Sequence, residues 1–319
     1  MFKNKVVLVT GGAGFIGSHI VDRCLEMNAE KVISFDNCSG VSINNHAHLK
    51  PGARFKLVKG DLTKKEDLGP CVEEADFIFN EATSKLVSSL KNPLLDVETN
   101  CYGNLNLLEL IRNSPNNPRI VHASTGSVFG DTQVPYQDEV SHKKPSTIYG
   151  INKLAAENYH LMYAKEYGVK SSILRYFHVY GPRQIGAAGV INVFLDRVLK
   201  GLPPQVCGSG DIVRCFTYVT DTANANFLLA QNNSSIGKRY NVASTARVKV
   251  ADLAHMIIQK YGPPGMKPEF VSPRLGDVKN PIPDTSEIEK LGFKESITFD
   301  EGLERTKQWI ANHVQNKNE

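Results

Sequence analysis

The feature that most constrains the fold is a glycine-rich segment, TGGAGFIG, that follows the first apolar run of the chain. Gly11, Gly14 and Gly17 lie between the run KVVLV and the helix-period segment FIGSHIVDRC. In this context the glycines permit a tight turn, a close backbone approach to a pyrophosphate and close helix packing. The helix N-terminus adds unpaired N–H groups and a positive dipole end. The segment predicts a dinucleotide site that includes Phe15 and Ile16.

Apolar runs and helix-period segments alternate over the first part of the chain. Runs rich in Val, Ile and Phe occur in KVISFD, FKLVKGD, DFIFN and RIVHAS, and we expect helices over about 94–112 and 148–167. Continuous apolar runs indicate strands that are buried on both faces. We therefore predict an α/β fold, a Rossmann-type doubly wound parallel sheet with a smaller mixed C-terminal domain.

The regular repeat ends beyond Gly181, where GPRQIGAAG, GLPP, GSGD, YGPPG and NPIPD divide the chain into short pieces. We predict a cofactor-binding domain over 1–180 with a returning segment near 214–228, including a strand near FTYVTD. The substrate-binding domain is then expected over 181–213 and 229–319.

Composition excludes several classes of function. The 37 Lys and Arg against 33 Asp and Glu leave a net charge of +4, which argues against a polybasic nucleic-acid surface. No apolar run reaches the roughly 18 residues of a membrane span, and the N-terminus lacks a signal-peptide profile. Six cysteines without a CxxC pair indicate neither zinc nor a disulfide framework. We expect a cytoplasmic protein with reduced thiols, no metal site and no nucleic-acid or membrane partner.

Acidic residues end the second and third apolar runs. Asp36, about twenty residues after the glycine turn, can accept hydrogen bonds from ribose hydroxyls. Its charge would repel a 2′-phosphate, so the sequence favours NAD over NADP, with Asn37 beside the same ribose. Asp61 and Leu62 end the third run, where Asp61 could reach the adenine or could serve as a turn residue.

Tyr149 and Lys153 stand four apart in a predicted helix, so their side chains share one face. An ammonium and a positive nicotinamide ring would favour the phenolate and lower the pKa of the tyrosine. Such a phenolate can accept a proton from a sugar hydroxyl while hydride leaves the carbon. Thr125, at the carboxyl end of RIVHAST, is predicted to bridge Tyr149 and the substrate oxygen. The neighbouring serines are also compatible with a turn that satisfies its own backbone.

Taken together, these segments resemble the extended short-chain dehydrogenase/reductase family, in its nucleotide-sugar epimerase and dehydratase branch. TGGAGFIG, FDN, GDL, NCYGNLNLLEL, YGINKLAAENY, LRYFHVYGPRQ, RCFTYVTD and PRLGDV follow the branch's order and spacing over nearly the whole chain. Within the branch the chain is most similar to the UDP-galactose (UDP-hexose) 4-epimerases. The resemblance implies NAD as cofactor, a UDP-linked hexose as substrate, and a homodimer formed through the helices near 94–112 and 148–167.

The resemblance also implies roles for residues that spacing alone leaves open. The implied cofactor-binding residues are Ala82, Lys85, Asn100 and Phe177. The implied substrate-binding residues are His178, Val190, Arg214 and Arg274. The two arginines are expected to bind the nucleotide diphosphate through their planar guanidinium groups.

Three positions depart from the family pattern. His178 stands where the branch usually has Asn, so it could replace a hydrogen bond, add pH sensitivity or mark altered specificity. Glu81 stands in NEAT, where relatives usually have HLAA, and we expect it to be paired and structural. Cys215 replaces the Asp of RDF, a change expected to affect packing more than chemistry.

The residues after Thr125 separate the possible reactions. The related 4,6-dehydratases carry T-D-E, because elimination of water needs an additional acid and base. UDP-glucuronate decarboxylases generally keep a glutamate in T-x-E, whereas this chain has Gly126 and Ser127. Asp36 opposes a reductase that consumes NADPH. The sequence thus predicts inversion of carbon 4 through a transient 4-keto sugar, with another nucleotide-sugar-modifying reaction and a non-catalytic NAD-sensing protein as alternatives.

Overall fold

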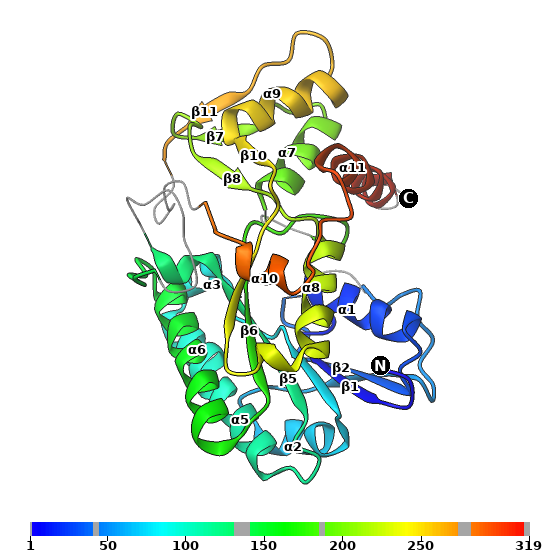
Figure 1. Cartoon of the computed structure of the whole chain (residues 1–319). Coiled ribbons are helices and arrows are strands. Elements are labelled where there is room, and N and C mark those ends of the chain that lie inside the picture. Colours follow the sequence, from blue (N-terminus) through cyan, green and yellow to red (C-terminus); the bar gives the residue numbers. More distant parts are fainter. Residues whose placement is uncertain (1, 41–44, 131–140, 185–188, 274–281, 316–319) are drawn as a thin grey trace.

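A seven-stranded parallel sheet forms the centre of the protein, shown in Figure 1 as a computed structural model that describes residues 2–40, 45–130, 141–184, 189–273 and 282–315. The strand order is β3-β2-β1-β4-β5-β6-β9, and all neighbouring pairs are parallel. The strands are β1 (Val6–Thr10), β2 (Lys31–Asp36), β3 (Phe55–Lys59), β4 (Phe77–Asn80), β5 (Arg119–Thr125), β6 (Ser171–Tyr176) and β9 (Arg239–Val242). Because the order reverses between β1 and β4, their carboxyl ends border a ligand crevice of the doubly wound type.

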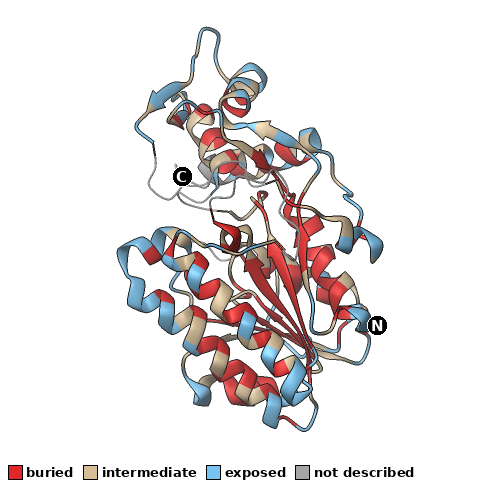
Figure 2. Ribbon diagram, turned by 60° about the vertical axis from the view of Figure 1, so that its left-hand side comes forward, coloured by how far each residue is buried: buried red, intermediate tan, exposed pale blue. Residues whose placement is uncertain are grey.

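Helices cover both faces of this sheet. Helices α1 (Phe15–Glu26) and α8 (Val219–Gln231) pack on one face, and α2 (Lys65–Glu74), α5 (Gly103–Asn113) and α6 (Ile148–Tyr167) pack on the other. Figure 2 shows the central strands almost continuously buried between these layers. The continuous apolar runs of the sequence are explained by this burial on two sides. The predicted fold class is confirmed.

The helical segment predicted over 94–112 is present but not uniform. It consists of α4 (Pro93–Val97), a π-helical stretch η1 (Glu98–Tyr102) and α5, and it follows the short helix α3 (Leu86–Lys91). Asn92 caps α4 by accepting a hydrogen bond from the N–H of Leu95 at 3.1 Å, and Pro93 occupies the first turn. None of the helices within the described ranges has the length and apolarity that crossing a membrane requires.

A smaller lobe lies beyond the carboxyl edge of the sheet (Figure 1). Helices α7 (Val190–Leu199), α9 (Val250–Tyr261) and α11 (Phe299–Gln315) surround its apolar cluster. Its strands form two short sheets, β8 (Val213–Cys215) with β10 (Arg247–Lys249), and β7 (Gln205–Cys207) with β11 (Glu269–Val271). Phe15 and Ile16 at the start of α1 pack against the same cluster, so the glycine turn lies where the lobes meet.

The prediction of a strand near FTYVTD is wrong. Residues from Val219 onward form α8, because Val219, Thr222, Ala223 and Asn226 repeat at helical spacing and are all buried. The strand that returns to the sheet is β9, which pairs with β6 and lies within the residues assigned to the second domain. The short helix α10 (Ser286–Lys290) packs beside β9.

Candidate active site

The first turn of α6 places Tyr149 against the end of β5. Thr147 caps the helix by accepting a hydrogen bond from the N–H of Gly150 at 3.1 Å. A Cβ atom at Gly150 would lie 2.6 Å from the carbonyl oxygen of Ser127, so only glycine allows the helix this close. The approach brings the Tyr149 side chain into hydrogen-bonding contact with Thr125, the pairing that the sequence predicted.

The Tyr149 phenol is strongly perturbed by its surroundings. Burial raises the pKa of Tyr149 to about 12, hydrogen bonds with Thr83 and Thr125 act against this rise, and the carboxylates of Asp96 and Glu81 add to it. A phenol in this state is a poor base at neutral pH. Base catalysis at this position therefore requires positive charge close to the hydroxyl.

Lys153 lies one turn further along α6, at the spacing that puts the two side chains on one face of the helix. Its side chain is 1% exposed, and within the described part of the chain its Nζ has no hydrogen-bond partner. Burial lowers the pKa of Lys153 to about 8, while Glu81, Glu157 and Asp96 raise it. A buried ammonium needs acceptor oxygens, so this site fits the hydroxyls of a cofactor ribose.

The glycine turn lies between β1 and α1 at the carboxyl edge of the sheet. Gly11 has φ +64°, and a Cβ atom there would lie 2.7 Å from the backbone nitrogen of Ala82. The turn thus rests directly on the end of β4. Helix α1 begins after Gly14 without a side-chain cap, so its first N–H groups can receive an anion. Asp36 accepts a hydrogen bond from the Ala13 N–H at 3.1 Å, which holds its carboxylate beside the turn. These features fit a dinucleotide.

Asn100 belongs to a buried polar layer between η1 and the sheet edge. Its amide donates hydrogen bonds to Asp96 at 3.0 Å and to the Ser84 carbonyl at 3.3 Å. Its carbonyl oxygen accepts a hydrogen bond from the Thr83 hydroxyl at 2.8 Å. Because Thr83 also contacts Tyr149, this layer connects Asn100 to the phenol.

The remaining residues predicted for the cofactor differ in exposure. Leu62 and Phe177 are buried, whereas Asn37 and Lys85 are exposed. Asp61 accepts hydrogen bonds from the N–H and hydroxyl of Thr63 at 2.9 and 2.8 Å. This arrangement is the turn role that the sequence left open for Asp61, and its carboxylate stays partly exposed.

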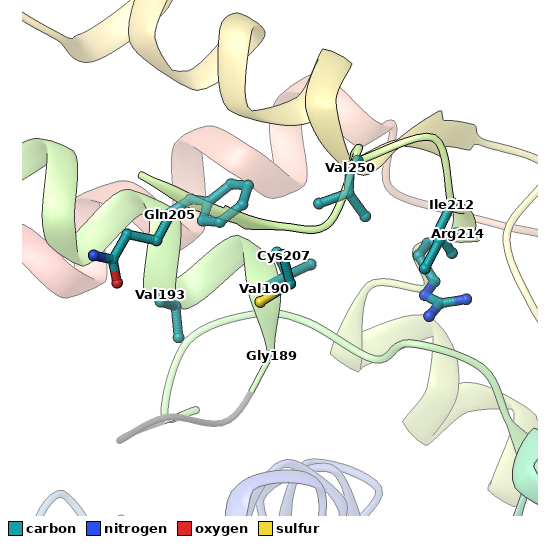
Figure 3. A pocket seen from close by; sticks show the side chains of 10 residues that line it. Gly189, Val190, Val193, Gln205, Cys207, Ile212, Arg214 and Val250 are labelled. Atoms are coloured by element: carbon teal, nitrogen blue, oxygen red, sulfur yellow. The ribbon is translucent and has the colours of Figure 1, made fainter. Parts of the chain in front are cut away.

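A pocket of about 120 Å³ in the smaller lobe brings together two residues predicted for the substrate, Val190 and Arg214. Arg214 is 8% exposed and lies at one end of the pocket, with Gln205 at the other (Figure 3). Cys207 and Val250 line the pocket between them. None of the three residues Gln205, Cys207 and Val250 was predicted from the sequence. Arg274 lies outside the described residues.

His178 follows β6 with φ +44°, a left-handed conformation that is uncommon for a residue with a side chain. Its ring makes a hydrogen bond to the backbone of Cys215, and burial with the nearby charge of Arg214 lowers the pKa of His178 to about 3. The imidazole is therefore neutral at neutral pH, which does not support a pH-sensing role there. Cys215 packs with Phe177 and Ala243 in a small apolar cluster, consistent with a packing role.

Sequence reasoning missed three further residues of the crevice, Thr83, Asp96 and Tyr176. Tyr176 donates a hydrogen bond to the Glu81 carboxylate at 2.6 Å, so Glu81 is paired as predicted. The signal that could have found Tyr176 is its place at the end of an apolar run, directly before Phe177. Asp96 carries no such signal, because its burial depends on contacts with Asn100 of η1 and Asn152 of α6.

A family model described as the NAD dependent epimerase/dehydratase family matches residues 7–243. The chain belongs to this family. It is therefore an NAD-dependent enzyme of the epimerase type, and the predicted cofactor and the resemblance to extended short-chain dehydrogenase/reductases are confirmed.

Individual members of the family align over nearly their full length. The putative UDP-glucose 4-epimerase of Methanocaldococcus jannaschii is 35% identical over 97% of this chain and 99% of that protein. The crystal structure of UDP-glucose 4-epimerase from Thermotoga maritima with UDP-glucose is 30% identical, with a TM-score of 0.89 over 97% of this chain and 99% of that one. The UDP-glucose 4-epimerase of Thermus thermophilus in complex with NAD is 32% identical, with a TM-score of 0.85 over 96% of this chain and 98% of that one.

Proposed function

We propose that this enzyme inverts carbon 4 of a UDP-linked hexose through a transient 4-keto intermediate. The observation that carries the proposal is the turn after Thr125. This threonine contacts Tyr149, while Gly126 and Ser127 begin the short helix η2 (Gly126–Phe129) and bring no carboxylate to it. Elimination or decarboxylation would need an additional acid or base at this turn. Inversion needs only the phenol and the cofactor.

In the proposed mechanism, Tyr149 removes the proton from the 4-hydroxyl of the sugar and later returns it. NAD supplies the acceptor and the donor of hydride at carbon 4. The Lys153 ammonium stabilises the phenolate, offsetting the burial that raises the pKa of Tyr149 to about 12. The Thr125 hydroxyl holds the phenol and the substrate oxygen in line.

The smaller lobe is proposed to hold the nucleotide. Arg214 and Arg274 would bind the diphosphate, and Val190 would pack against the nucleoside in the pocket of the smaller lobe. His178 would contact the sugar as a neutral hydrogen-bonding group. Inversion requires tight binding of the nucleotide and loose binding of the hexose, because a tightly held keto sugar could not turn its other face to the hydride.

We also propose that the enzyme is a homodimer through η1 and helices α4 and α6. Large apolar side chains are exposed along these elements, with Leu94 reaching 74% exposure. The others are Leu95, Val97, Tyr102, Ile148, Ile151, Met162 and Tyr167. An exposed apolar face of this extent on adjacent helices is typical of a contact between subunits. Sedimentation velocity should give twice the chain mass, and Leu94→Glu with Ile151→Glu should give the monomer.

A substrate panel tests the proposed reaction. The purified enzyme is incubated with NAD and UDP-glucose, UDP-galactose, their N-acetyl forms or UDP-glucuronate, and products are identified by NMR. We expect interconversion of one pair of 4-epimers without net reduction of NAD. A 4-keto-6-deoxy or pentose product would instead assign a dehydratase or decarboxylase, and bound NAD without turnover of any sugar would favour a sensing protein.

A further inference from the structure

A second hydroxyl, that of Thr83, lies beside Tyr149 at the carboxyl edge of the sheet. Asn80 ends β4 and pairs in register with His122 of β5. Thr83 and Thr125 each follow their member of this pair by three residues, so they come after neighbouring parallel strands at the same edge. Both make side-chain hydrogen bonds with the Tyr149 phenol. The proposed reaction uses Thr125 alone.

The proton of the Thr83 hydroxyl is directed away from Tyr149 in this structure. The hydroxyl donates to the side-chain carbonyl of Asn100 at 2.8 Å and to the backbone carbonyl of Ser84 at 2.9 Å. Asn100 keeps this orientation because its amide nitrogen donates to Asp96 and to the same Ser84 carbonyl, at 3.0 and 3.3 Å. A hydroxyl has one proton and two lone pairs, so Thr83 can only accept a hydrogen bond from the neutral phenol while these bonds are made.

A series of buried hydrogen bonds fixes Thr83 relative to the helix that carries Tyr149. One carboxylate oxygen of Asp96 accepts from the Asn100 amide and also from the Asn152 amide, the latter at 2.7 Å. Asn152 lies three residues after Tyr149, on the same side of α6. Asp96 and Asn100 are both 0% exposed. Thr83 is therefore joined to α6 through contacts that do not involve the phenol.

Loss of the phenol proton changes which acceptor the Thr83 hydroxyl prefers. A neutral phenol can donate a hydrogen bond, whereas a phenolate can only accept. Hydrogen bonds to an ionised oxygen are roughly twice as strong as those between neutral groups, so the phenolate is a stronger acceptor than the carbonyl of Asn100 or Ser84. Burial raises the pKa of Tyr149 to about 12, and the hydrogen bond with Thr83 acts against that rise, as a donor to the phenolate does.

We propose that Thr83 is a positioning residue whose O–H group turns from Asn100 to Tyr149 when the phenol loses its proton, so that two threonine hydroxyls hold the phenolate. Only the hydroxyl rotates, and no covalent bond of Thr83 forms or breaks. A neutral hydrogen bond to Asn100 is lost, and a charge-assisted hydrogen bond to the reacting oxygen is gained. The carboxylates that act on Tyr149, Asp96 of α4 and Glu81 after β4, keep their places. The inference rests on the proposed function only in treating Tyr149 as the base.

The test follows the tyrosinate absorbance of Tyr149 against pH in NAD-saturated protein, with Tyr149→Phe in each background to isolate the signal. Thr83→Val removes the hydroxyl and keeps the shape of the side chain. We expect it to decrease the phenolate fraction about tenfold at a fixed pH below the midpoint, a rise of about one in apparent pKa. Thr83→Ala should act in the same direction and guards against misfolding of the first variant. Thr83→Ser, which keeps a hydroxyl, should stay within about twofold of the wild type.

A matched control comes from the smaller lobe, where Thr306 of α11 donates a hydrogen bond to the Gly302 carbonyl at 2.6 Å. Thr306→Val makes the same chemical change in that lobe and should leave the Tyr149 titration unchanged. The proposal is overturned if folded, NAD-binding Thr83→Val and Thr83→Ala titrate as the wild type does, or if Thr83→Ser titrates as Thr83→Val does. Because this readout needs no turnover, an enzyme inactive on every nucleotide sugar would refute the proposed reaction, while the titration would still decide the role of Thr83.

Discussion

The two lobes place their charged groups in different ways. In the sheet lobe, Arg175 of β6 and Glu157 of α6 form an ion pair whose side chains are both 0% exposed. In the smaller lobe, Lys260 and Asp300 form an ion pair of the same 2.6 Å length whose side chains are 37% and 73% exposed. The buried pair ties the helix that carries Tyr149 to the strand that leads to Phe177, whereas the exposed pair joins surface helices.

This contrast agrees with the different functions that we propose for the two lobes, chemistry for the sheet lobe and nucleotide binding for the smaller lobe. Proton and hydride transfer depend on positions held within fractions of an ångström, so their supports are long strands and buried polar bonds. Nucleotide recognition needs a shaped pocket, and the smaller lobe builds it from three-residue strands and the start of α7. We therefore expect turnover and stability to depend mainly on the sheet lobe, and affinity for the nucleotide sugar to depend on the smaller lobe.

The largest expected effect is on turnover. Tyr149→Phe removes the proposed base and should lower kcat about thousandfold, within the range of general-base contributions. Binding of NAD should persist, because the glycine turn and Asp36 are untouched. Epimer interconversion and NAD retained after gel filtration are the measurements. Turnover at the wild-type rate would exclude Tyr149 from the chemistry.

The second-largest expected effect is on the free energy of unfolding, through the buried ion pair of the sheet lobe. Glu157→Ala leaves the Arg175 guanidinium buried without its partner and also removes the acceptor of the Ser124 hydroxyl. The expected loss is about 3–5 kcal/mol in the free energy of unfolding, measured by urea denaturation. Asp300→Ala in the smaller lobe should cost less than about 1 kcal/mol. Equal losses of unfolding free energy in the two variants would show that the buried and the exposed ion pair stabilise the protein to the same extent.

A smaller effect is expected on affinity. Arg214→Ala should raise the KM for the nucleotide sugar about thirtyfold, since a hydrogen bond to a charged group contributes about 2 kcal/mol. The kcat should change little, because Arg214 lines the pocket of the smaller lobe and is proposed to bind the diphosphate rather than the reacting carbon. Steady-state kinetics with the substrate identified by the panel provide the measurement. A fall in kcat with unchanged KM would place Arg214 in the chemistry instead.

The smallest expected effect is a pH dependence of stability. His160 is fully buried, stacks on His122 at 4.2 Å, and burial lowers its pKa to about 3. Below its unfolded pKa of about 6.5 the unfolded chain takes up a proton that the folded chain excludes, so stability falls as pH decreases. The loss between pH 6.5 and 5 should be about 1.6 kcal/mol.

His160→Gln, which can still bond to Ser171 and Asn104, should flatten this slope in urea denaturation at the two pH values. His255→Gln in α9 serves as the control from the smaller lobe, because that imidazole is exposed and stays hydrated in both states. A slope unchanged by His160→Gln would assign the acid sensitivity to other groups.

Much of the sheet lobe could be predicted from sequence because its signals are local. The glycine turn, the apolar runs and the spacing of Tyr149 and Lys153 each depend on neighbouring residues. The returning strand was misplaced because β9 is only four residues long, and a run of that length is ambiguous without its partner β6. Of the residues that line the pocket, only Val190 and Arg214 were predicted, since Gln205 and Cys207 come from a strand of three residues.

The sequence by itself determined the parallel sheet, the place of the dinucleotide turn and the candidate base, since periodicity and short spacings encode them. Only the tertiary structure decided the charge environment of that base. Glu81, Asp96 and Tyr176 come from three separate elements, and burial brings their effects together at one sheet edge. Burial and charge determine pKa values, and both depend on contacts between residues that are distant in the chain.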